Sequence, residues 1–181
     1  MLPTTVLAAD GPMDTIPKYD VSIDVYNRTS DISIKDSRSY YIYSSVPDKL
    51  RDTWAWDKKI FIKGDKTAPH VFIDGVNIEM SPSSKGPAIE LNKKASAYIY
   101  FIGKNSSLQG ADGRAAIQKN RSEGQLYVLA RTGTTVTCKG GDKAAGIGGS
   151  WATRNIAESL FNLDMYGHGA NMHFGSQTNP S

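Results

Sequence analysis

The sequence predicts an all-β fold, a parallel β-helix (a strand solenoid) of about four coils behind an irregular N-terminal cap. Two kinds of landmark recur with the same pair of spacings, 28 and then 30 residues. They are the glycines Gly75, Gly103 and Gly133, and the isoleucines Ile89, Ile117 and Ile147. A short apolar run with β-forming residues follows Phe61, Ile89 and Ile117 at nearly the same distance. One turn of such a coil cannot bury its apolar face alone, so the turns are expected to stack at the ~4.8 Å spacing of paired strands.

Stacked turns place equivalent residues in columns through the interior. The predicted columns are Ile89, Ile117 and Ile147, then Met80, Leu108 and Cys138, and then Ile78, Ser106 and Val136. One period of 28 before Ile89 lies Phe61, inside the strand-like residues 59–63. In its column Cys138 is a small buried hydrophobe rather than a nucleophile.

Alternation within the apolar runs predicts which side chains face the core. The residues predicted to face inward are Val71, Ile73, Ile99, Phe101, Tyr127 and Leu129, and those predicted to stack outside are Phe72, Tyr100 and Val128. The opposite choice would bury Asp74, which is costly for a carboxylate.

Composition limits the function classes. The chain has 181 residues, enough for one domain, and its 39% of apolar residues exclude a disordered protein. The net charge of +3 is too weak to indicate nucleic acid or an anionic membrane as partner. The single cysteine excludes an intrachain disulfide framework. No apolar run is long enough to predict a membrane span.

The two ends differ from the repeats. Residues 1–19 are interpreted as the remnant of a secretory signal or a plain apolar N-terminus, 20–58 as the cap and first irregular coil, 59–167 as the β-helix coils, and 168–181 as a loop-like tail. Residues 152–166 fit a helix face or an alternating strand, and the strand is preferred. A stack that ends in the tail leaves an open edge, where self-association is expected unless the chain continues or a partner covers it. An antiparallel sandwich is the rival fold, against which the repeat spacing argues.

Residues 142–149 resemble a repeat element of a known group of proteins. Their D-K-A-A-G-I-G-G turn, with the preceding residues 134–141, is similar to the A-A-G-I-G-G element of secreted repetitive proteins from Gram-positive bacteria, and residues 84–89 and 110–117 are degenerate copies. The resemblance covers roughly residues 59–150 and implies a right-handed parallel β-helix in a carbohydrate-binding or adhesive surface module. Independently, Gly146, Gly148 and Gly149 are expected to allow positive φ and close backbone approach, with Ala144, Ala145 and Ile147 filling a narrow interior.

Hydrolytic chemistry has little support. Two carboxylates would have to converge across a sugar, and no predicted column repeats an acid. Asp112 beside Arg114 suggests a lyase-like base, but a glycine-flanked D-G-R is more typical of a solvated turn. No catalytic residue and no cofactor is predicted.

Metal and nucleic-acid sites are equally weak. Asp164, His168 and His173 lack a zinc spacing, and calcium at Asp10, Asp14, Asp65 or Asp142 has no loop motif. No metal site is predicted. The pairs Lys58–Lys59, Lys93–Lys94 and Lys119–Arg121 are interpreted as a charged, solvated edge.

The candidate ligand-binding residues are aromatic. Flat exposed rings with polar neighbours suit a sugar, and the candidates are Trp54, Trp56, Phe72, Tyr98 and Tyr100. The alternative is that the two tryptophans plug the first coil and that Phe72 and Tyr100 pack beneath a loop.

These observations predict a non-catalytic, secreted or cell wall-associated module that binds a polysaccharide or cell-surface glycan, or acts as an adhesin. The alternatives are a polysaccharide-degrading lyase or glycoside hydrolase of β-helix architecture and a purely structural spacer.

Overall fold

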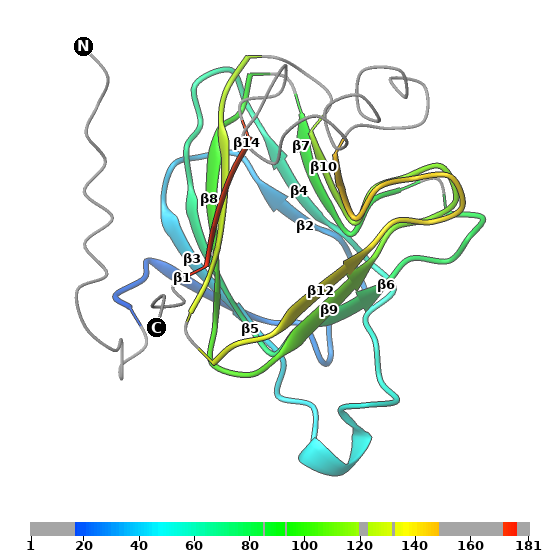
Figure 1. Ribbon diagram of the computed structural model, residues 1–181. Helices are drawn as coiled ribbons and strands as arrows, with labels where there is room; N and C mark the ends of the chain where they lie inside the picture. Colours follow the sequence, from blue (N-terminus) through cyan, green and yellow to red (C-terminus); the bar gives the residue numbers. More distant parts are fainter. Residues whose placement is uncertain are drawn as a thin grey trace, which may run out of the picture.

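A computed structural model shows an all-β chain whose parallel strands stack as a solenoid of about four turns (Figure 1). It describes residues 17–84, 86–92, 94–119, 123–131 and 133–148, and the backbone of 172–176. Every strand pair in these ranges is parallel. The predicted fold class is confirmed.

Three sheets, A, B and C, surround the interior. From His70 onward the chain visits them in the order A, C, B in each turn, whereas the described turns before it have no named strand in sheet C. Sheet A contains β1 (Val21–Asp24), β3 (Ser39–Tyr43), β5 (His70–Asp74), β8 (Ala97–Ile102), β11 (Leu126–Ala130) and β14 (Met172–Ser176). Sheet B contains β2 (Ile32–Ile34), β4 (Ile60–Lys63), β7 (Ile89–Asn92), β10 (Ile117–Lys119) and β13 (Ile147–Gly148). Sheet C contains β6 (Asn77–Glu79), β9 (Ser106–Gln109) and β12 (Val136–Lys139). Between β3 and β4 the chain leaves the coil in an excursion that holds the 3-10 helix η1 (Asp48–Leu50).

A continuous column of isoleucines forms the wall of the core at sheet B. Its members are Ile32, Ile60, Ile89, Ile117 and Ile147. The predicted alignment of the last three is confirmed. Ile60 lies opposite Ile89, so Phe61, one residue further, points outward opposite Glu90. Burying each isoleucine contributes roughly 1.5–3 kcal/mol, which makes this column a main source of stability.

The column through sheet C is shifted from the predicted one. It consists of Ile78, Leu108 and Cys138. Met80 therefore does not lie opposite Leu108, and that prediction is wrong. The corner after β8 contains two residues, Lys104 and Asn105, that have no counterpart in the corner after β5. The connection from β9 to β10 is in turn two residues shorter than the connection from β6 to β7. Because the two differences cancel, the constant spacing of the glycines and isoleucines conceals the shift.

The predicted facing is confirmed in β5 and β8 and is wrong in β11. Val128 lies opposite the inward Ile99, and Leu129 lies opposite the outward Tyr100, so Tyr127 and Leu129 point away from the core. The connection from β10 to β11 is one residue longer than that from β7 to β8. Since side chains alternate along a strand, one extra residue reverses the facing of the whole strand.

Two other expectations are corrected. β14 lies within residues 168–181, for which the sequence predicts a loop, and pairs with β11. Gly146 and Gly148 do not have positive φ, whereas Lys143 does, with φ of 58°. Close approach at Gly146 is confirmed, because a Cβ there would lie 2.3 Å from the Cys138 carbonyl oxygen. Residues 1–16 and 152–166 lie outside the described residues.

Candidate functional site

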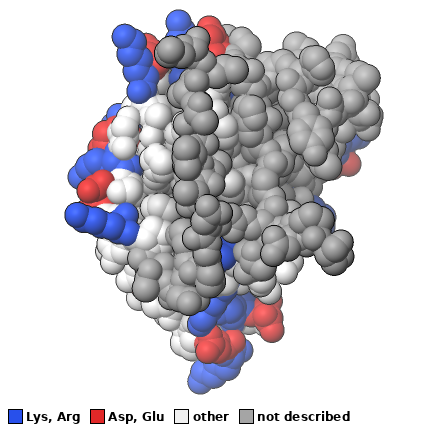
Figure 2. Space-filling view, turned by 60° about the vertical axis from the view of Figure 1, so that its left-hand side comes forward, with Lys and Arg blue, Asp and Glu red and all other residues white. Residues whose placement is uncertain are grey.

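The outward positions of sheet A bring aromatic side chains together on one side of the solenoid. We call the set the aromatic face, and it comprises Tyr41, His70, Phe72, Tyr98, Tyr100 and Tyr127. The face consists of two files that run from turn to turn. The first file is His70, Tyr98 and Tyr127, and the second is Tyr41, Phe72 and Tyr100. Figure 2 brings this side forward and shows mostly uncharged residues in the middle of its described part, with charged side chains toward the edges.

The rings of the aromatic face are stacked. Tyr98 and Tyr127 have centroids 4.6 Å apart and an interplanar angle of 5°, and His70 stacks on Tyr98 at 4.7 Å and 12°. In the second file Phe72 stacks on Tyr100 at 5.0 Å and 23°. Parallel strands in register place equivalent side chains ~4.8 Å apart, which is close to the spacing of stacked rings. The rings therefore cover one another's faces. Tyr41 and Phe72 are buried, each with 8% of its surface exposed, whereas His70, Tyr98, Tyr100 and Tyr127 keep part of their surface exposed.

The polar atoms of the aromatic face belong to neutral groups. The Tyr100 hydroxyl lies 3.2 Å from His70 Nδ1, and the Tyr127 hydroxyl donates to Gln125 Oε1. The Tyr98 hydroxyl has no hydrogen-bond partner within the described part of the chain. Burial raises the pKa of Tyr100 to about 12 and lowers the pKa of His70 below its usual 6.5. At neutral pH the Tyr100 phenol is protonated and the His70 imidazole is uncharged.

The five sequence candidates separate into two places. Phe72, Tyr98 and Tyr100 lie together on the aromatic face. Trp56 lies in the core with 3% of its surface exposed, and its Nε1 donates to the Arg28 carbonyl oxygen at 2.7 Å. Trp54 is half-buried and packs edge-on against Tyr26. The two tryptophans thus lie apart from the other three candidates, Trp56 in the core and Trp54 against it.

Sequence reasoning missed three members of the aromatic face. Tyr127 was excluded by the reversed facing of β11. Tyr41 was missed because β3 lies 31 positions before β5 in register, outside the period of the later turns. His70 was missed because it precedes the apolar run that marked the strand. A search for aromatic residues two positions apart in successive strands would have found Tyr41 and His70, but not Tyr127, which has Leu129 two positions later.

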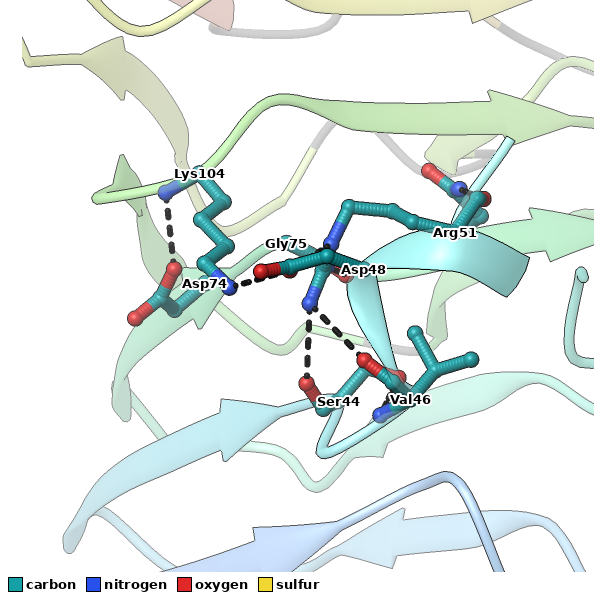
Figure 3. Close-up of polar contacts among 8 residues, drawn as sticks. Ser44, Val46, Asp48, Arg51, Asp74, Gly75 and Lys104 are labelled. Carbon is teal, nitrogen blue, oxygen red and sulfur yellow. Dashed lines mark hydrogen bonds and ion pairs between the residues drawn. The ribbon is translucent and has the colours of Figure 1, made fainter.

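A polar cluster joins the excursion to the corner between sheets A and C (Figure 3). The Arg51 guanidinium donates to the carbonyl oxygens of Gly75 at 2.9 Å and Val46 at 3.3 Å. Asp48 forms an ion pair with Lys104 at 2.8 Å. Arg51 Nε makes no hydrogen bond but lies 3.5 Å from Asp48 Oδ1 as an ion pair. The cluster thus ties η1 to the solenoid, and we call it the Arg51 clasp.

Carboxylates at the corners hold successive turns together. Five of them accept a backbone N–H from the following turn, and these are Asp20, Asp24, Asp31, Asp74 and Asp112. Asp112 and Asp142 occupy equivalent positions in successive turns, which corrects the expectation that no column repeats an acid. Asp112 Oδ1 accepts the Asp142 N–H at 3.2 Å, so this pair acts in a corner rather than across a sugar.

One of the expected edge cations is buried. Lys119 is 3% exposed and lies in an inward position opposite Leu91, with Nζ 2.6 Å from the Glu123 carbonyl oxygen. The interpretation of Lys119 as a solvated edge residue is therefore wrong. Lys59 forms an ion pair with Glu90 at 2.7 Å on the outside of sheet B. Lys93 and Arg121 lie outside the described residues.

In the described ranges no three histidine, cysteine or acidic side chains are grouped so that they could hold a metal ion. Asp10, Asp14, Asp164 and His168, and the side chain of His173, lie outside them. Within the same ranges, no helix has the length and apolar character that crossing a bilayer requires.

Comparisons of the chain with models of protein families, with curated proteins and with solved structures find no match.

Proposed function

We propose that the protein is a non-catalytic binding module that holds a carbohydrate on the aromatic face. The observation that carries this proposal is the pair of ring files on the outside of sheet A. Tyrosine is amphipathic, so a partly exposed ring can supply apolar contact area to a sugar while its hydroxyl bonds a sugar hydroxyl. The proposed contacts are Tyr98, Tyr100 and Tyr127, with His70 and Phe72 as neighbours.

Rigidity supports this assignment. Each ring is held by the ring above or below it, and all of them stand on paired strands. A side chain that is already ordered loses little conformational entropy when a ligand binds. Trp54 and Trp56 are not part of the proposed site, because Trp56 is buried in the core and Trp54 packs against the core.

The proposed location is outside the cell, on a bacterial surface or wall. It rests on the resemblance of residues 142–149 to secreted Gram-positive repeat proteins and on the proposed ligand. The hydrolase or lyase alternative gains no support from the corner aspartates, because they bind backbone N–H groups.

Binding to immobilised polysaccharides and to a glycan array tests the proposal. We expect the protein to bind at least one glycan and Tyr98→Ala to weaken that binding at least about tenfold, or 1.4 kcal/mol. Phe61→Ala is the matched control, since Phe61 is an outward aromatic residue on sheet B. Equal losses in both variants, or no binding by the native chain, would overturn the proposal.

A further inference from the structure

We infer that the ligand of the aromatic face is a neutral, extended, β-1,4-linked glycan that runs along the solenoid axis across β5, β8 and β11. This inference rests on the proposed function and specifies its substrate class. It depends on two observations, which are the straight course of the first ring file and the absence of charge in the files.

The straight course of the first file selects the linkage. Its rings recur at 4.7 and 4.6 Å, one ring for each turn of the coil, and are nearly parallel, with interplanar angles of 12° and 5°. An extended β-1,4-linked chain is also straight, so it can stay in contact with the whole file. An α-1,4-linked chain coils and a β-1,3-linked chain curves, so both leave the file after a short contact.

The charge pattern selects a neutral polymer. The outward side chains of β5, β8 and β11 in the two files carry no formal charge, and they are His70, Phe72, Tyr98, Tyr100, Tyr127 and Leu129. The nearest outward acid, Asp74, accepts hydrogen bonds from the Tyr41 hydroxyl and the Lys104 N–H, both at 2.8 Å. An acidic polysaccharide would require basic partners that these positions do not supply.

Calorimetric titration with oligosaccharides of two to six units tests the linkage. We expect β-1,4-linked gluco-oligosaccharides to bind at least tenfold more tightly than α-1,4-linked or β-1,3-linked chains of equal length, and at least tenfold more tightly than oligogalacturonate. Affinity should rise with length beyond two units and change less than twofold between 50 and 500 mM salt. Equal affinity for the three neutral linkages, or preference for the acidic chain, overturns the inference and leaves the proposed function standing. Binding of no glycan overturns both.

Variants along one file test the direction. Tyr127→Ala and His70→Ala each remove one end of the first file. These two positions lie on different strands along the solenoid axis, whereas Tyr98 and Tyr100 lie on the same strand. If the glycan follows the axis, each end variant weakens binding of a tetrasaccharide at least fivefold and of a disaccharide less than twofold, because the short ligand can use the remaining rings. Equal losses for both ligands overturn the axial orientation, and Phe61→Ala should change neither affinity.

Discussion

Lys143 occupies the position that Gly113 holds one turn earlier, and both residues have left-handed backbone, with φ of 58° and 70°. Left-handed backbone costs roughly 1–2 kcal/mol for a residue with a Cβ and little for glycine. The exposed ion pair of Lys143 with Asp142, at 3.7 Å, offsets little of this cost. The last described turn is thus strained where the previous turn is relaxed.

Replacing Lys143 by glycine should stabilise the protein. We expect Lys143→Gly to raise the free energy of unfolding by about 1 kcal/mol in urea titrations, because the strain is removed. Thr137→Gly, an exposed position inside β12, is the control and should lower it by about 0.5–1 kcal/mol. A loss of stability in Lys143→Gly would contradict the assignment of strain.

We expect the buried Ser106 hydroxyl to be required for full stability of the core. The sequence predicts Ile78 beside Ser106, but Val76 lies there, and its N–H donates to Ser106 Oγ at 3.1 Å. Ser106→Ala leaves this buried N–H without a partner, so we expect a loss of about 1–3 kcal/mol in the free energy of unfolding. Ser107→Ala removes an exposed hydroxyl from the adjacent position and should change it by less than about 0.5 kcal/mol.

The Arg51 clasp should hold the excursion in place. Arg51→Ala removes charged donors from the carbonyl oxygens of Gly75 and Val46, and we expect a loss of about 1.5–3 kcal/mol. Hydrogen exchange should accelerate in residues 44–55 more than in the Ile89 and Ile117 strands. Lys49→Ala, on the exposed side of η1, should leave both measurements unchanged, and a uniform acceleration in Arg51→Ala would exclude a local role.

Cys138 should react slowly while the protein is folded. Burial raises the pKa of its thiol to about 11, and the thiolate is the reactive form. We expect alkylation at pH 8 to be about 100-fold slower than in urea-unfolded protein, and its rate to keep rising beyond pH 9.5. The absence of any other cysteine makes the measurement specific. Equal folded and unfolded rates would show an accessible thiolate instead.

Acidification should destabilise the protein through His70. Its folded pKa lies below the unfolded value of 6.5, so the unfolded chain binds the proton first. Stability is therefore complete above about pH 7.5 and decreases as the pH falls through 6.5. His70→Gln should show a smaller decrease in Tm between pH 7.5 and 5.5 than the native protein. If Tm decreases equally in both proteins, groups other than His70 cause the decrease.

Much of the fold follows from local pattern. The 28-residue and 30-residue spacings bring Ile89, Ile117 and Ile147 into one column, and alternation places Phe72 and Tyr100 outside. Both inferences depend on strands that are equivalent in sequence. The aromatic face was predicted only in part, because Tyr127 stands on a strand whose facing depends on the length of the preceding loop.

By itself, the sequence determined the strand solenoid, its approximate period and the isoleucine wall, since these depend on repeated apolar residues that must be buried. Only the tertiary structure decided the register of sheet C, the facing of β11 and the burial of Lys119. A corner can be one or two residues longer at small energetic cost. Because paired strands must keep a register of whole residues, such a difference in corner length changes which side chains lie opposite one another. The stacking of Tyr98 on Tyr127 arises from such a difference.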